Sequence, residues 1–185
     1  MTNYFEVLGL PESLVLDDET LKERFHKISA EVHPDAGGED ATRFQLANDA
    51  FNVLRQPSRR LLHLLALRGF SEQTTQPPAD LIDLFFETSA ALKSADDITR
   101  RFDSAANALQ KALLTRELMQ CEERLTHTLQ TLTLLETQAL AKLPDAALDW
   151  PAISKIAHTL SYLTKWKTEI AQRQTRLAEK AFGAL

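Results

Sequence analysis

Residues 21–54 decide the fold of this chain and read LKERFHKISAEVHPDAGGEDATRFQLANDAFNVL. Before the tripeptide HPD, apolar residues follow one another at spacings of four, three and four, which places them on one face of an α-helix: Leu21, Phe25, Ile28 and Val32. Pro34 ends this helix, because the residue before a proline disfavours helical dihedrals. After a polar turn a second helix carries its own apolar face and ends before Pro57: Phe44, Ala47, Phe51 and Leu54. Two such helices predict an antiparallel hairpin with HPD at its tip.

The remainder of the chain predicts an all-α fold in two parts. Residues 71–78 read SEQTTQPP, a polar stretch ending in two prolines, and form the predicted linker between a domain at 1–70 and a domain at 79–185. Helices are expected at about 80–92, 96–143 and 149–182. Two of them carry apolar residues at heptad-like spacing: Leu118, Cys121, Leu125, Leu132, Leu135 and Ala139, then Ile153, Leu160, Leu163, Ile170 and Leu177. Such seams predict a C-terminal three-helix bundle or antiparallel coiled coil.

Composition excludes several classes of function. The net charge of −5 and the lack of a basic run argue against a nucleic-acid partner. The single cysteine, Cys121, permits neither an internal disulfide nor a cysteine-based metal cage. No stretch approaches the roughly 18 consecutive apolar residues of a membrane span, and the N-terminus lacks a secretory pattern, so we expect a cytoplasmic protein without a membrane partner. Glu123 and His127 lie one helical turn apart without a third ligand and are read as a surface pair.

The hairpin with its HPD loop resembles a J domain, and its surroundings narrow the resemblance. The segments that carry it are Tyr4-Phe5 followed by LGLP at 8–11, LRQP at 54–57, Arg59-Arg60, and LLALRGF at 64–70. Together with a C-terminal helical region containing Trp150 and the pair Leu163 and Lys165, they are similar to the HscB family. HscB proteins are J-type co-chaperones of iron–sulfur cluster assembly.

The resemblance implies a regulator of a partner's ATPase and not an enzyme, with no catalytic residue, cofactor or metal of its own. The partner would be a DnaK/HscA-type chaperone, docking on His33, Pro34 and Asp35 and on a cationic helix face formed by Lys22, Arg24, His26 and Lys27. The client would be an IscU-like iron–sulfur scaffold protein, docking on the C-terminal domain at Leu81, Ile82, Phe85 and Tyr162. A monomer is favoured.

Several alternatives stay open at the level of sequence. The run Leu81-Ile82-Asp83-Leu84-Phe85-Phe86 is apolar around most of a helix, so it either exposes a partner site or is buried on both faces. Glu31, Val32 and Ala36 depart from the usual J-domain pattern and weaken the cationic surface. The alternative functions are a J-domain protein for a different client and a structural helical adaptor whose J domain is inactive.

Overall fold

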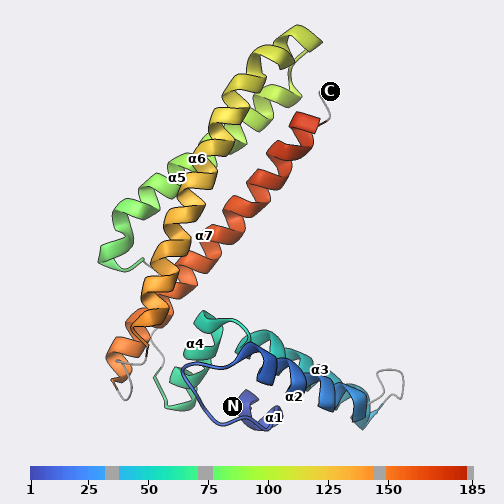
Figure 1. The fold of residues 1–185 in the computed structure, drawn as a ribbon, viewed down its shortest axis with the longest axis vertical. Coiled ribbons are helices and arrows are strands. Elements are labelled where there is room, and N and C mark those ends of the chain that lie inside the picture. Colours follow the sequence, from blue (N-terminus) through green and yellow to red (C-terminus); the bar gives the residue numbers. More distant parts are fainter. Residues whose placement is uncertain (32–37, 71–76, 144–148, 183–185) are drawn as a thin grey trace. The chain divides into compact units, whose positions relative to one another are not determined.

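The computed structural model describes residues 1–31, 38–70, 77–143 and 149–182, and every regular element within these ranges is a helix. Figure 1 shows their order along the chain. The elements are α1 (Tyr4–Val7), α2 (Asp18–Glu31), α3 (Glu39–Leu54), α4 (Pro57–Leu67), the short 3-10 helix η1 (Ala79–Leu81), α5 (Ile82–Asp103), α6 (Ala108–Ala141) and α7 (Trp150–Phe182). The all-α prediction is therefore confirmed.

The chain forms two compact units that do not follow its order. One unit contains Met1–Thr75 together with Leu140–Ser161, and the other contains Gln76–Ala139 together with Tyr162–Leu185. Aromatic contacts account for part of the first grouping. The ring of Trp150 stacks on that of Phe70 with centroids 6.0 Å apart, and the guanidinium of Arg68 lies 5.6 Å from the centre of the Trp150 ring. The sequence-based boundaries after residues 70 and 78 remain a prediction.

Helices α2 and α3 pack against each other as the predicted antiparallel hairpin. The rings of Phe25 and Phe51 stack with centroids 4.6 Å apart, and Arg43 near the start of α3 pairs at 3.3 Å with Glu31 at the end of α2. The side chain of Asp17 caps α2 by accepting the backbone N–H of Thr20 at 2.8 Å, and this hydrogen bond lowers the pKa of the Asp17 carboxyl. The HPD tip of the hairpin lies outside the described residues.

The hairpin covers a core to which the first and fourth helices contribute. Its fully buried members include Phe5, Leu8, Leu21 and Leu54. His63 of α4 is also buried, and its Nε2 accepts the backbone N–H of Tyr4 at 3.1 Å while its ring stacks on the Tyr4 ring with centroids 4.7 Å apart. An acceptor at Nε2 requires the neutral imidazole. Burial accordingly lowers the pKa of His63.

Arg60 of α4 is a buried cation that ties two other segments of this unit to α4. Only 4% of it is exposed, and its Nε donates to the carbonyl of Leu14 at 3.2 Å while Nη1 donates to the carbonyl of Leu54 at 2.9 Å. The Leu54 carbonyl ends α3, where no intrahelical donor remains for it. The guanidinium therefore satisfies a helix end and a loop at once. Its neighbour Arg59 points to solvent.

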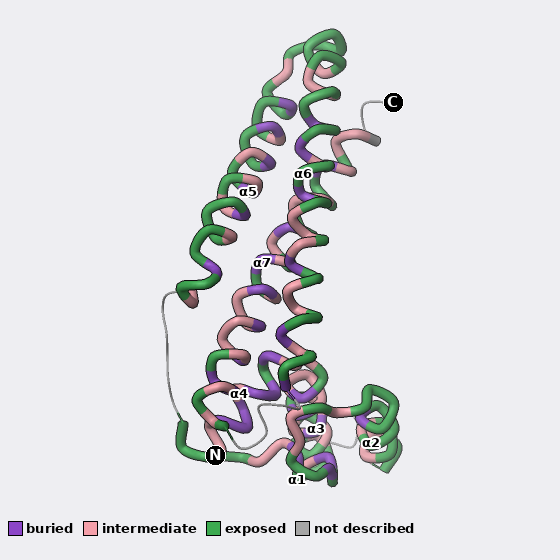
Figure 2. The backbone as a smooth tube through the Cα atoms, turned by 60° about the vertical axis from the view of Figure 1, so that its left-hand side comes forward, coloured by how far each residue is buried: buried purple, intermediate pink, exposed green. Residues whose placement is uncertain are grey.

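The second unit is built from the long helices, whose buried positions recur along one side of each (Figure 2). In α6 they fall at exact intervals of seven: Leu118, Leu125, Leu132 and Ala139. In α7 the same interval separates Leu163, Ile170 and Leu177. This heptad spacing is that of helices packed along a coiled-coil seam, as the sequence predicted. Cys121 is buried within the seam, and burial raises the pKa of its thiol.

The predicted break between the first two of these helices was wrong. The sequence placed it at residues 93–95, whereas α5 continues to Asp103 and α6 begins only at Ala108. Asp96 and Asp97 begin the helix expected over 96–143, but they lie inside α5 and pair with arginines: Arg173 with Asp96 at 3.2 Å and Arg100 with Asp97 at 3.1 Å. The actual start of α6 is stabilised by Asn107, whose Oδ1 accepts the backbone N–H of Gln110 at 2.9 Å.

Candidate protein-docking surfaces

The outer face of α2 carries the cationic residues that the sequence singled out. Lys22, Arg24, His26 and Lys27 are all exposed. Lys22 and His26 lie four residues apart and Arg24 and Lys27 three apart, so the members of each pair are neighbours on the exposed surface of the helix. Glu23 is exposed among them and reduces the net positive charge. His33, Pro34 and Asp35 lie outside the described residues, so the structure places the cationic face but not the loop.

The start of α5 exposes an apolar surface. Ile82 is 42% exposed, Phe85 37% and Phe86 64%. Phe85 lies beside Trp166 of α7, with ring centroids 6.1 Å apart, and Tyr162 lies 5.7 Å from the same indole. Trp166 is itself only 4% exposed, so it forms a buried base beneath the two other rings. The structure thus brings together Phe85 and Tyr162, which are far apart in sequence.

Two residues of this region differ from the sequence-based expectation. Leu81 was expected to contact a client, but it is 5% exposed and packs in the core of the bundle, where a partner cannot reach its side chain. Phe86 was named as part of the apolar run but not among the expected client-docking residues, although it is the most exposed of the three apolar side chains of this surface. Its place beside Phe85 was visible in the sequence. Which of the two rings faces the core depends on the rotation of α5 about its axis.

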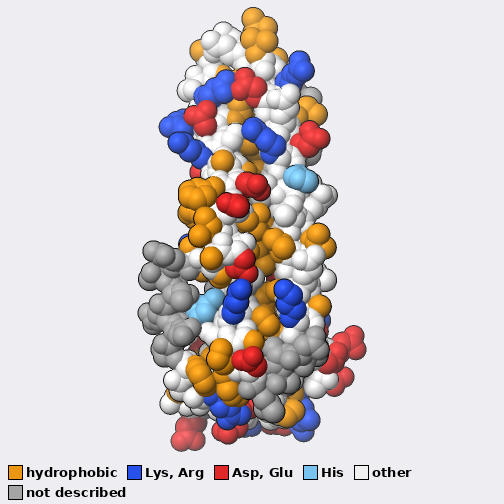
Figure 3. Space-filling model, turned by 90° about the vertical axis from the view of Figure 1, so that its left-hand side faces the viewer, with side chains coloured by type: hydrophobic (Ala, Val, Ile, Leu, Met, Phe, Trp, Pro, Cys, Tyr) orange, Lys and Arg blue, Asp and Glu red, His pale blue; other side chains and the backbone are white. Residues whose placement is uncertain are grey.

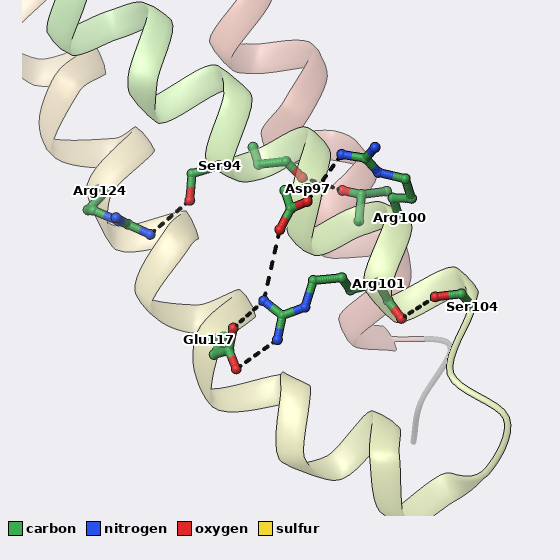
Figure 4. A network of polar contacts seen from close by, with 9 residues as sticks. Ser94, Asp97, Arg100, Arg101, Ser104, Glu117 and Arg124 are labelled. Atoms are coloured by element: carbon green, nitrogen blue, oxygen red, sulfur yellow. Dashed lines mark hydrogen bonds and ion pairs between the residues drawn. The ribbon is translucent and has the colours of Figure 1, made fainter.

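Polar contacts hold α5 and α6 together beyond this surface (Figure 4). The guanidinium of Arg101 donates to both carboxylate oxygens of Glu117, at 2.6 and 3.1 Å, and these hydrogen bonds lower the pKa of Glu117. Two turns further along α6, Nη2 of Arg124 donates to Oγ of Ser94 at 3.0 Å. These links fix which residues of the two helices face each other.

The described part of the chain offers no candidate metal site, since no three His, Cys, Asp or Glu side chains within it are arranged to share an ion. Among the same residues no helix is both long and apolar enough to span a bilayer. Two exposed surfaces among the described residues are candidates for docking a partner: the cationic face of α2 and the apolar surface of α5.

Comparison with known proteins agrees with the architecture. The family model of the DnaJ domain matches residues 3–63. A co-chaperone protein HscB homolog from Shewanella baltica is 36% identical over 83 residues, which are 40% of this chain and 48% of that protein. The chain thus spans about half the length of this relative.

A longer alignment and a solved structure extend the likeness to both units. A co-chaperone protein HscB homolog from Vibrio cholerae is 31% identical over 131 residues, covering 62% of this chain and 77% of the relative. The solved structure of the chaperone HscB from Vibrio cholerae superposes with a TM-score of 0.64 at 22% identity, covering 95% of this chain and 99% of that one, and so shares the fold. Because the chain matches the DnaJ domain and is 31% identical to the HscB homolog from Vibrio cholerae over 77% of that relative's length, it belongs to the HscB family of co-chaperones.

Proposed function

We propose that this protein is a J-domain co-chaperone that stimulates ATP hydrolysis by a DnaK/HscA-type chaperone and delivers an IscU-like iron–sulfur scaffold protein to it. The observation that carries the proposal is membership of the HscB family together with a helical hairpin whose connecting residues read HPD. We assign chaperone binding to the domain at residues 1–70 and client binding to the domain at residues 79–185.

The chaperone-binding role rests on the hairpin. A proline between His33 and Asp35 restricts the backbone, so the imidazole and the carboxylate lose little conformational entropy when a partner binds them. The exposed cations of α2, from Lys22 to Lys27, attract an acidic surface and speed the encounter. Glu23 lies among them and makes this attraction moderate. Because these charges are exposed, high salt screens the attraction.

The test of this role is a steady-state ATPase assay with the purified chaperone from the same organism. The wild-type protein should raise the hydrolysis rate, and His33→Gln should abolish the effect without changing the circular dichroism spectrum. His158→Gln, a half-exposed histidine of α7 outside the hairpin, is the matched control and should stimulate like the wild type. If the wild type left the rate unchanged, the protein would instead be an adaptor with an inactive J domain.

The client-binding role rests on the apolar surface of α5 and α7. Exposed phenylalanines cost free energy in water, and burying such rings is the main source of affinity at protein interfaces. The buried ring of Trp166 contacts the rings of both Phe85 and Tyr162, so the three side chains form one aromatic cluster. Ile82 extends the surface, whereas Leu81 is excluded from it by its burial.

Calorimetry with the scaffold protein tests this role. The double variant Phe85→Ser with Tyr162→Ala should weaken scaffold binding at least tenfold, because two aromatic contacts at an interface are each worth about 1 kcal/mol or more. The same variant should stimulate the chaperone ATPase normally, since the hairpin is untouched. Equal scaffold affinity in the variant and the wild type would remove this surface from consideration and favour a different client.

A further inference from the structure

The outward side of α6 carries a regular stripe of exposed residues, opposite the buried seam of the same helix. Its members follow one another at alternating intervals of four and three, and each of them is exposed: Leu109, Leu113, Arg116, Gln120, Glu123 and His127. The stripe is about 27 Å long, at about 1.5 Å per residue. Because all six residues are exposed, neither α5 nor α7 covers this stripe.

Only two residues of the stripe are charged at neutral pH, and they have opposite signs. Arg116 and Glu123 lie seven residues apart, about 10 Å along the helix axis, whereas charged side chains of one helix pair at spacings of three or four. Within the part of the chain that the structure describes, neither side chain forms an ion pair or a hydrogen bond. Both charges are therefore available to a partner.

The two charges are placed symmetrically for an antiparallel contact between two copies of α6. A two-fold axis near Gln120 brings Arg116 of each copy opposite Glu123 of the other, so that two reciprocal ion pairs form. The same axis brings Met119, which is 63% exposed, beside the Met119 of the other copy. The contact thus has an apolar centre with an ion pair on each side of it.

The exposed leucines of the stripe lie at the ends of this contact. Leu109 is 71% exposed and Leu113 69%, and the antiparallel arrangement places Leu113 opposite His127 of the other copy. Exposed apolar side chains of this size favour association, because contact with a partner removes their surface from water. The leucines therefore add apolar burial to the two ion pairs.

The flank of the stripe that faces α5 is compatible with the same arrangement. Glu117 and Arg124 point toward α5, where they contact Arg101 and Ser94 (Figure 4). Arg124 keeps its positive charge when it donates to the Ser94 hydroxyl. The two-fold axis brings it nearest to Glu117 of the other copy, so opposite charges also face each other on this flank.

We propose that two copies of this chain pair antiparallel along the exposed stripe of α6 and form a weak, reversible dimer. The partner follows from charge: with a net charge of −5 two copies repel each other unless opposite charges meet, and this stripe makes them meet twice. Elsewhere acidic, basic and hydrophobic side chains are interspersed, as Figure 3 shows for one face of the molecule. The inference goes beyond the proposed function, whose client surface lies on α5 and α7.

The dimer should be weak because each copy contributes a single helix, which buries less than the roughly 1,200 Å² of a standard interface. The test is sedimentation equilibrium of the full chain from about 5 to 500 µM, over which the average mass should rise from 20.8 kDa toward twice that value. Arg116→Glu and Glu123→Arg each place like charges opposite one another and should weaken dimerisation about tenfold, because two exposed ion pairs are replaced by repulsion. Arg176→Glu and Glu179→Arg make the same charge changes at exposed positions of α7 and should dimerise like the wild type.

Exchange of charge between the copies gives the decisive measurement. The double variant Arg116→Glu with Glu123→Arg restores opposite charges across the axis and should recover dimerisation. An equimolar mixture of the two single variants should also associate, because one stripe then carries two negative charges and the other two positive charges. Thermal unfolding should confirm that every variant is folded.

Three results would overturn the proposal. The first is a wild-type protein that stays at the monomer mass over the whole concentration range. The second is a pair of single variants that dimerise like the α7 controls, which would place the contact elsewhere on the molecule. The third is a double variant that dimerises no better than the single ones, because charges that meet across two copies must be interchangeable.

Discussion

Arg60 offers the sharpest test of how the N-terminal unit is held together. Truncation to alanine removes the donors of two hydrogen bonds, to the carbonyls of Leu14 and Leu54, and leaves both acceptors without their partner. Each lost bond to a charged donor costs about 1.5–3 kcal/mol. Loss of two buried methylene groups adds about 1.6 kcal/mol.

An opposing term reduces this sum. The guanidinium is desolvated in the folded protein, and burial lowers the pKa of Arg60, with Asp18 only partly compensating. Burying this charge costs the folded wild type on the order of 2–3 kcal/mol, a cost that the alanine variant does not bear. The net expectation is that Arg60→Ala lowers the free energy of unfolding by about 2–6 kcal/mol. Arg60→Met keeps the apolar stem and should cost less than the alanine variant.

Urea unfolding followed by circular dichroism measures these differences, with the m-value checked for each variant because the chain forms two units. The control is Arg59→Ala, which removes the same side chain from an exposed position one residue away. It should leave the midpoint unchanged within error. A stability of Arg60→Ala equal to that of Arg59→Ala would refute the role of the buried guanidinium.

Three further predictions follow from buried groups. Because burial lowers the pKa of His63, the unfolded chain binds the proton more readily than the folded one, so the free energy of unfolding should fall as the pH drops below about 6.5. His63→Gln should flatten this dependence in urea titrations from pH 7 to 5, whereas the exposed control His26→Gln should keep it. Thr88 has a buried Oγ1 without a hydrogen-bond partner, so Thr88→Val should stabilise the bundle by about 1 kcal/mol. The control Thr99→Val removes a hydroxyl that donates to the carbonyl of Ala95 at 2.7 Å and should not stabilise it. Equal changes in the free energy of unfolding for the two variants would contradict this reasoning. Leu125→Ala should destabilise the bundle by about 3 kcal/mol through the cavity it leaves in the seam, and an unchanged thermal midpoint would show that the position is not in the core.

The periodicity of apolar residues predicted the two hairpin helices and the buried seam, but not the break between α5 and α6. Spacings of three and four identify a helix face whatever surrounds it, so Leu21, Phe25 and Phe51 were placed correctly, as was Leu125. Charge at a helix start was less informative. Asp17 caps α2, whereas Asp96 and Asp97, where a helix was expected to begin, lie inside α5 and pair with arginines of the bundle.

The sequence by itself determined the all-α class, the paired helices of the hairpin and the family resemblance, since these depend on local spacing and on short motifs. Only the tertiary structure decided which of two adjacent, chemically similar residues is buried: Arg60 and not Arg59, and Leu81 and not Ile82. Only the tertiary structure also showed that Glu87 of α5 and Glu123 of α6 line the same surface groove. The physical reason is that the rotation of a helix about its axis and its choice of neighbours are set by packing against segments distant in sequence, which no local pattern encodes.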